Sequence, residues 1–329
     1  MTADARQSFA KFAWGVTAYN LAVILWGAWV RITGSGAGCG EHWPTCHGEI
    51  LPRDAGIETL IELTHRATSG ITLILTVVVV WKAVRVFERG ERSRTWAWIT
   101  LAFVLAEAAL GAVLVLEGLV DKNDSVQRAV VIALHLMNTN GLLAAGVLSA
   151  LWAHPDRSEA KLSIHWLTTP ILAGLVIVGM TGAITALGDT LFPVSPTDDG
   201  GLIARINEGT TTGEHFLVRL RIVHPIIAVL VSVGMMFISA YVYGKTQSAL
   251  LRRAVKWVIG LVALQVSLGV LNVLLYAPGW MQLVHLLAAD ILWIVTVVMV
   301  VLLAEDEAAQ AGLDKAEWVS NPLETQGTA

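Results

Sequence analysis

Histidines inside apolar segments are the residues of this sequence best suited to chemistry. Four of the nine histidines, His65, His135, His224 and His285, lie within long apolar stretches. A polar side chain in such a stretch is costly in a membrane and usually serves a function. Two imidazoles from facing helices can hold haem iron between them. The alternative for any single histidine is a hydrogen bond across a bundle, but four matching positions favour haem as the ligand.

The histidines recur in the same order in both halves of the chain. Each half has one histidine near the start of its second apolar segment and another in its fourth, so the repeat pairs His65 with His135 and His224 with His285. Neither pair brings the three or four ligands of a zinc centre. Other positions that match between the halves are Glu62/Arg221, Glu107/Gln265, Gly111/Gly269 and Asn140/Asp290.

The two halves differ beside the first histidine of each pair. Glu62 precedes His65 by three residues, and Arg221 precedes His224 by the same interval. Residues three apart share one helix face, so the carboxylate of Glu62 could act as acid, base or nucleophile at the first site. The guanidinium of Arg221 could hold a haem propionate at the second. Alternatively, Glu62 is an interfacial carboxylate that suits the helix dipole.

Two further acids lie inside apolar segments. Glu107 and Asp290 are expected to form hydrogen bonds within the bundles.

The two cysteines, Cys39 and Cys46, lie in a glycine-rich loop that also holds Pro44. This loop is expected on the outer, oxidising side of the membrane, where a disulfide is favoured. A bond closing so short a loop could be redox-active, or it could simply staple the loop. A zinc site that adds His42 and His47 to the cysteines is the weaker alternative.

These residues must be positioned by membrane helices. The chain has 329 residues, of which 55% are hydrophobic and 15% charged, and crossing about 30 Å of hydrocarbon takes about 20 apolar residues. Only helices or closed barrels satisfy the backbone in lipid, and the segments are too long for barrel strands. We therefore expect an all-α fold of eight membrane helices, over residues 12–32, 60–87, 95–119, 128–153, 166–187, 216–243, 255–276 and 281–304.

The first helix is expected to be retained rather than cleaved as a signal peptide. Residues 1–153 and 154–304 would form two pseudo-symmetric four-helix bundles, and 305–329 a disordered, acidic cytoplasmic tail. Basic loops after the second, fourth and sixth helices place those loops and both termini in the cytoplasm. The scattered basic residues leave no nucleic-acid surface.

The eight-helix duplication, the four histidines, the Glu62-x-x-His65 motif and the paired cysteines resemble haem A synthase, a bacterial and mitochondrial family that serves cytochrome oxidase assembly. The sharpest local likeness is the run from Gly34 to Cys39 followed by His42-Trp-Pro-Thr-Cys46. The resemblance covers about residues 12–304.

The resemblance implies an oxidoreductase of the cell (inner) membrane. Its members convert haem O to haem A by oxidising the C8 methyl to a formyl through two successive hydroxylations. By resemblance, the substrate haem O binds His65 and His135, haem b is the iron cofactor on His224 and His285, and Glu62 is catalytic. The expected partners are haem O, haem A, membrane lipid, a haem O synthase and an unidentified electron donor.

Two other functions fit the same histidines. A di-haem b-type electron carrier would use both pairs without a catalytic carboxylate, but such carriers place their haems toward opposite membrane faces. A haem chaperone would bind the haem without changing it.

Overall fold

The computed structural model describes residues 2–53, 55–154, 157, 168–193 and 214–320, with side chains described as far as residue 310. Over these residues the regular structure is helical, apart from one isolated β-bridge between Cys46 and Glu49. Eight of the described helices are long and apolar enough to cross a membrane. The chain is therefore an all-α, multi-pass membrane protein, as the sequence predicted.

Four long helices come from each half of the chain. The first half holds α1 (Ala3–Ile32), α2 (Ile57–Val86), α3 (Arg92–Leu116) and α4 (Val126–Leu151). The second half holds α5 (Thr168–Leu191), α8 (Val223–Lys245), α9 (Ala249–Leu274) and α10 (Gly279–Ser320). The short elements are η1 (Ser35–Ala37), α7 (Phe216–Arg219) and η3 (Leu220–Ile222).

Serine caps begin two of the long helices. The hydroxyl of Ser125 accepts the backbone N–H of Arg128 at 3.2 Å, and that of Ser248 accepts the backbone N–H of Leu251 at 3.3 Å. Each cap satisfies one of the free N–H groups that every helix start leaves. The sequence thus fixes the starts of α4 and α9 locally.

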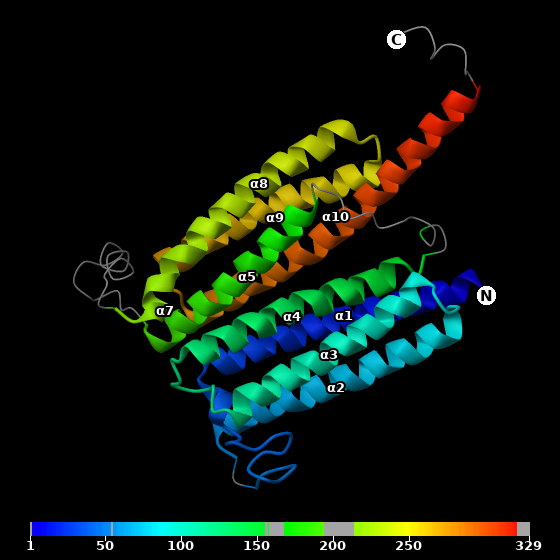
Figure 1. Ribbon diagram of the computed structural model, residues 1–329. Coiled ribbons are helices and arrows are strands. Elements are labelled where there is room, and N and C mark those ends of the chain that lie inside the picture. Colours follow the sequence, from blue (N-terminus) through cyan, green and yellow to red (C-terminus); the bar gives the residue numbers. More distant parts are fainter. Residues whose placement is uncertain (1, 54, 155–156, 158–167, 194–213, 321–329) are drawn as a thin grey trace.

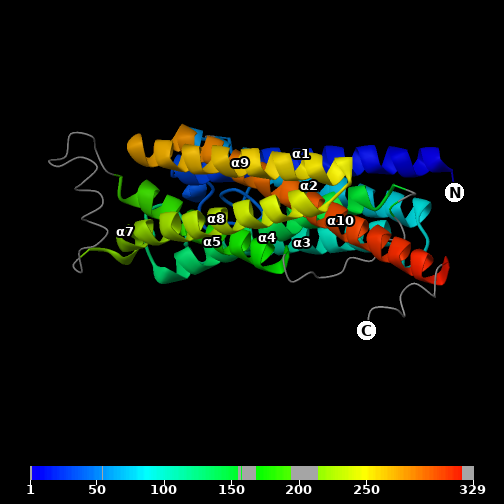
Figure 2. The same cartoon turned by 90° about the horizontal axis from the view of Figure 1, so that it is seen from above.

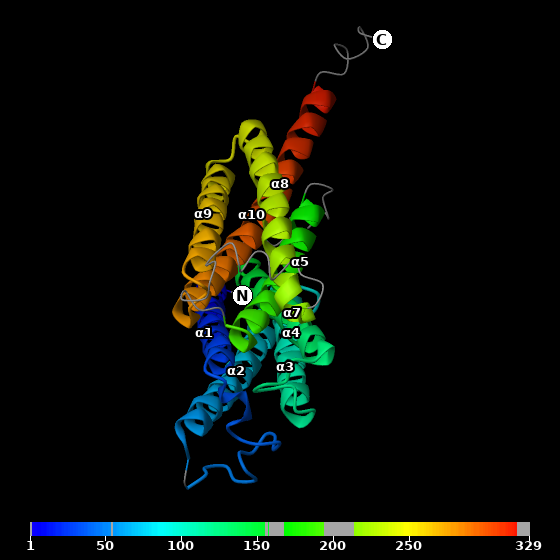
Figure 3. The same cartoon turned by 90° about the vertical axis from the view of Figure 1, so that its left-hand side faces the viewer.

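The helices pack in two groups of four with the same order of contacts. Helix α1 contacts α2, α2 contacts α3, α3 contacts α4, and α4 returns to α1. In the second group α5, α8, α9 and α10 contact one another in the same cycle. Figure 1 shows the two groups as separate layers, and Figure 3 shows the second group above the first.

Successive long helices run in opposite directions, so the loops alternate between the two ends of the molecule. The N-terminus and the end of α10 lie at one end, while the loop that follows α1 and the short helix α7 lie at the other (Figures 1 and 2). We call the latter the cysteine-loop end because it carries Cys39 and Cys46. All four even-numbered spans begin there.

The centre of the molecule is formed by α4 and α10, whose spans are the most deeply buried of the eight. Their apolar side chains make a shared core that includes Leu143, Val147, Trp293 and Val297. The indole Nε1 of Trp293 also donates a hydrogen bond of 2.8 Å to the backbone carbonyl of Asn140. Because α4 carries His135 and α10 carries His285, this core fixes one histidine of each pair relative to the other.

Three differences from the sequence prediction are larger than the rest. Helix α1 begins at Ala3, nine residues before the predicted start at residue 12. The expected continuous helix over 216–243 is divided into α7, η3 and α8, because Pro225 has no N–H to donate to the carbonyl of Arg221.

The third difference is the length of α10, which continues to Ser320. The prediction of a disordered tail is wrong for residues 305–320. This stretch is rich in alanine and glutamate, which are strong helix formers. The end of the tail (321–329), the first residues of the predicted 166–187 segment, and much of the loop between α5 and α7 lie outside the described residues.

Candidate functional site

All four intramembrane histidines lie toward one end of the molecule. His65 is in α2, His135 in α4, His224 in α8 and His285 in α10, each within about the first three turns of its helix. Since these helices all begin at the cysteine-loop end, the two pairs share that end of their bundles. A carrier that moves electrons across a membrane would instead need sites near both faces.

The first pair faces the interior of the first bundle. His65 and His135 lie near enough to interact electrostatically, and a Cβ added to Gly27 of α1 would stand 2.9 Å from Cε1 of His65. Glycine at this position lets α1 approach the imidazole. The Nδ1 atom of His65 is buried and has no hydrogen-bond partner among the described residues.

Glu107 of α3 binds the second histidine of this pair. Its Oε2 contacts Nδ1 of His135, and its Oε1 accepts a hydrogen bond of 2.7 Å from the hydroxyl of Thr139. Thr139 lies one turn beyond His135 on α4. The sequence predicted that Glu107 would serve as a hydrogen-bonding residue of the bundle, and these contacts confirm it.

In the second pair, the side chains that hydrogen-bond the rings are neutral. His224 and His285 interact electrostatically. The hydroxyl of Thr181 lies 3.2 Å from Nδ1 of His224, and the amide nitrogen of Gln265 lies 3.2 Å from Nε2 of His285. Glycines again lie against the rings, since a Cβ on Gly182 or Gly269 would stand 3.0 or 3.3 Å from the nearest ring carbon.

These arrangements suit axial ligation of haem. The Nδ1 atoms of His65 and His285 are buried without a hydrogen-bond partner in the part of the chain that the structure describes, so these rings are not fully committed to hydrogen bonds within the bundles. No group of three or more metal-binding side chains occurs among those residues. Haem iron needs only two protein ligands, because the porphyrin supplies the other four.

Glu62 lies one turn before His65 and is only 3% exposed. Its Oε2 accepts the backbone N–H of Cys39 at 2.8 Å. Its Oε1 binds Arg66, which donates through Nε at 3.0 Å and also through Nη2. The carboxylate is thus held by both α2 and the loop, next to one histidine of the first pair.

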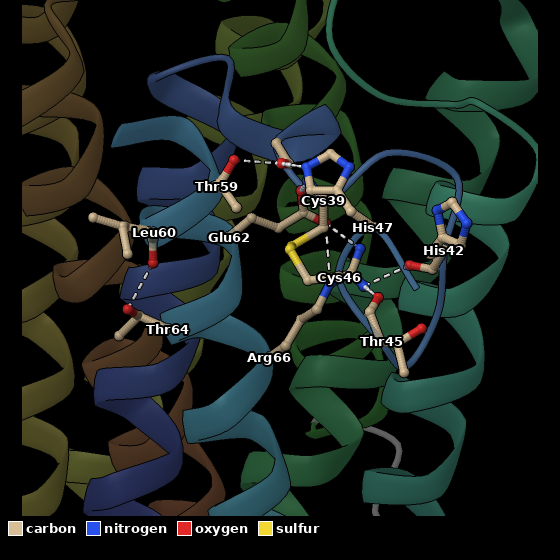
Figure 4. The surroundings of a disulfide bond; sticks show 11 residues. Cys39, His42, Thr45, Cys46, His47, Thr59, Leu60, Glu62, Thr64 and Arg66 are labelled. Carbon is tan, nitrogen blue, oxygen red and sulfur yellow. Dashed lines mark hydrogen bonds and ion pairs between the residues drawn. A yellow bond between two sulfur atoms is a disulfide. The ribbon is translucent and has the colours of Figure 1, made fainter. Parts of the chain in front are cut away.

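Arg66 also ties down the loop. Its Nη1 donates hydrogen bonds of 2.6 Å to the backbone carbonyls of His42 and Thr45, as Figure 4 shows. These two hydrogen bonds, together with the one from the Cys39 N–H to Glu62, hold the loop across the start of α2. A single arginine therefore couples the path of the loop to the orientation of Glu62.

Cys39 and Cys46 form the predicted disulfide, with their Cα atoms 4.4 Å apart, and both are fully buried. This disulfide removes the two thiolates that the alternative zinc site would need. Gly38 packs directly on the first turn of α2, where an added Cβ would lie 2.5 Å from the backbone of Glu58. Only glycine allows this approach, which places the neighbouring Cys39 N–H at Glu62.

Arg221 is buried, with 8% of its surface exposed. Its Nε lies 2.9 Å from Oδ1 of Asp189, and its Nη2 donates to the backbone carbonyls of Gly188 and Phe192. Asp189 is therefore an ion-pair partner of this buried guanidinium. These contacts fasten the start of α8 to the end of α5.

The four histidines, Glu62, Arg221 and the cysteines were predicted from the sequence, and in the structure they lie toward the cysteine-loop end. Several residues that hold them were not predicted: Gly27, Arg66, Thr181, Gly182 and Asp189. The four-residue spacing of Glu62 and Arg66, typical of helical ion pairs, was the available signal for one of them. Asp290, expected to form a hydrogen bond, is buried with Oδ2 unpartnered among the described residues.

The fold and the histidine pairs define a multi-pass α-helical membrane protein with two intramembrane histidine sites. The model of the cytochrome oxidase assembly protein family matches residues 10–297, and the chain belongs to this family.

Its curated relatives carry two different names. Two proteins, from two strains of Thermus thermophilus, are named protoheme IX farnesyltransferase and are 44% identical over 300 residues. The match covers 90% of this chain and 48% of each relative, so the chain spans about half the length of these proteins. A protein named heme A synthase from Bacillus mycoides is 39% identical over 113 residues, or 34% of this chain and 36% of that protein.

Proposed function

We propose that this protein is a haem A synthase that oxidises the C8 methyl group of haem O to a formyl group by two successive hydroxylations. The observation that carries the proposal is the position of Glu62, a buried carboxylate one turn from His65 and anchored to the disulfide loop. The second pair has no such carboxylate, since Arg221 occupies the matching position. A histidine pair with an acid one turn away suits chemistry, whereas a pair with an arginine at that position suits a cofactor.

The first bundle would bind the substrate haem through His65 and His135. The second would hold haem b through His224 and His285, and haem b, when bound, would supply electron transfer. The unpartnered ring nitrogens and the glycines that admit the imidazoles occur in both pairs and support haem binding at each. Glu62 would move a proton at the substrate site, and its contacts with the Cys39 N–H and Arg66 keep its carboxylate from turning away.

The protein would lie in the cell (inner) membrane with the cysteine-loop end outside and both termini in the cytoplasm. Basic side chains concentrate at the opposite end, as cytoplasmic loops require. A farnesylated haem is too apolar for water, so a site between membrane helices lets it arrive through lipid. The basic residues at the cytoplasmic end include Arg85, Arg89, Arg92, Arg94, Lys245, Arg252 and Arg253.

A haem O synthase would be the functional partner, because it makes the substrate. The Thermus relatives support this link, since they carry a farnesyltransferase name and about half of each is unmatched by this chain. We assign the farnesyl transfer to that unmatched half. The electron donor is a further partner that the proposed reaction requires.

Expression of the chain together with a haem O synthase, in a host that lacks haem A, tests the proposal. Haem A among the extracted haems, identified by mass, is the expected result for the natural chain. Unmodified haem O with a folded, haem-loaded protein would instead favour the di-haem carrier or the haem chaperone.

The names of the Thermus relatives favour one other function, farnesyl transfer to protohaem IX. The same host without the haem O synthase distinguishes it. Haem O formed by this chain alone would establish the transferase and would contradict our assignment of that activity to the unmatched half.

A further inference from the structure

The two histidine sites differ in the group that holds their second histidine. In the first site, the Glu107 carboxylate contacts Nδ1 of His135 and accepts the hydroxyl of Thr139 at 2.7 Å. The side chain of Glu107 is 16% exposed, so it lies largely inside the bundle. Both oxygens are engaged by residues of α4, which fixes the carboxylate against the imidazole.

The matching position in the second site carries an amide. Gln265 precedes Gly269 by four residues, as Glu107 precedes Gly111. Its amide nitrogen lies 3.2 Å from Nε2 of His285, the opposite ring nitrogen from the one that Glu107 contacts. Nδ1 of His285 is buried without a hydrogen-bond partner among the described residues. His285 thus has neither the carboxylate partner nor the Nδ1 contact that His135 has.

A carboxylate that accepts the Nδ1–H of a ligating histidine has two effects. It fixes the ring orientation so that Nε2 points to the metal, and it makes the imidazole a stronger donor. A stronger donor and a nearby negative charge both favour ferric over ferrous iron. A neutral amide provides no comparable charge.

We infer that Glu107 is a positioning residue of the first site, which presents Nε2 of His135 to the substrate iron and makes that iron more electron-rich than the iron of the second site. The inference rests on the proposed function, since it takes His135 as a haem ligand. It adds a second carboxylate to the first site, with a role separate from that of Glu62. Glu107 acts through His135 and not on the reacting methyl group.

The test is a redox titration of the 329-residue chain loaded with haem b in both sites, combined with its low-spin electron paramagnetic resonance spectrum. Glu107→Gln should raise the midpoint potential of one haem, shift its spectrum and weaken its binding by roughly 10- to 100-fold. Glu107→Asp should restore part of each change. The potential of the other haem should stay the same.

Gln265→Glu places a negative charge beside His285 and keeps the test independent of whether Glu107→Gln folds. Because residue 265 faces Nε2 and not Nδ1 of that ring, its effect comes from charge alone, and it should lower the midpoint potential of the haem that Glu107→Gln leaves unchanged. Unaltered potentials and spectra in both variants, or equal shifts of both haems in each, would overturn the inference. These readouts need no turnover, so a natural chain that fails to make haem A would contradict the proposed function without deciding the role of Glu107.

Discussion

Arg66 holds the carboxylate of Glu62 from the same face of α2, with its Nε 3.0 Å from Oε1. The two side chains are 11% and 5% exposed, so the ion pair is largely removed from water. The remaining guanidinium nitrogen binds the carbonyls of His42 and Thr45 in the disulfide loop. One residue therefore links the loop, the candidate catalytic acid and the helix that carries His65.

Arg66→Ala should abolish most haem A formation, because Glu62 would lose its orientation. A small misplacement of a reacting group costs on the order of 100-fold in rate. Breaking a buried pair also leaves an uncompensated charge, at a cost of about 3–5 kcal/mol in stability. Haem A per folded chain is the measurement, with thermal unfolding measured in parallel.

The double variant Arg66→Ala with Glu62→Gln separates these two effects. It should recover much of the lost stability, because no buried charge is left unpaired, yet it should remain inactive. Full haem A formation by Arg66→Ala would show that the ion pair between Arg66 and Glu62 has no role in the reaction.

Replacement of both cysteines by serine should release the loop from its short closure. A disulfide that closes a loop of this length contributes roughly 2–3 kcal/mol by the chain-entropy model. The Cys39 N–H would then hold Glu62 less firmly, so haem A formation should fall while the second site keeps its haem b. Loss of both haems together would instead indicate a general folding role for the bond.

Gly27→Ala should empty the first site selectively. The added methyl group would stand 2.9 Å from Cε1 of His65 and would displace the ring. Gly15→Ala in the same helix is the matched control, because nothing lies within 4 Å of its added Cβ. We expect one bound haem per chain for Gly27→Ala and two for the control, measured by absorbance of the purified proteins reconstituted with haem b.

Gly182→Ala should empty the second site and leave the first loaded, since its Cβ would stand 3.0 Å from the ring of His224. Retention of both haems in both glycine variants would contradict the placement of the two sites.

Asp189→Ala should weaken the second site through Arg221. The arginine is buried and would lose the carboxylate 2.9 Å from its Nε, so the junction between α5 and α8 should loosen. Haem b should dissociate from the second site faster, while substrate haem binding at the first site should persist. Asp189→Asn keeps the size of the side chain and one acceptor oxygen, so it should speed haem b dissociation less than Asp189→Ala does. Equal loss from both sites would mean that this junction supports the whole fold.

Hydropathy and the spacing of the histidines were enough to predict eight helices and two histidine pairs. The helices follow from the composition of each segment, and the pairs follow from the repeat between the two halves, both of which the sequence displays directly. The Glu107 contact with His135 could not be predicted, because it depends on how α3 and α4 rotate against each other. The loop contacts of Arg66 depend on the path of residues 34–56, which the disulfide and Gly38 determine only in three dimensions.

Two other differences had local signals in the sequence. Pro225 lies where a continuous helix would need its N–H, and the helix indeed breaks just before it. The alanine- and glutamate-rich stretch after residue 304 favours helix, although its charge suggested disorder.

The most direct measurement is the mass of the haem recovered after the purified, haem b-loaded chain is supplied with haem O, oxygen and a chemical electron donor. The natural chain should yield haem A, and Glu62→Gln, matched in size and in haem content, should yield haem O or a hydroxylated intermediate. Haem A in equal amounts from both proteins would contradict the role of Glu62. Unchanged haem O from the natural chain would contradict the proposed function itself.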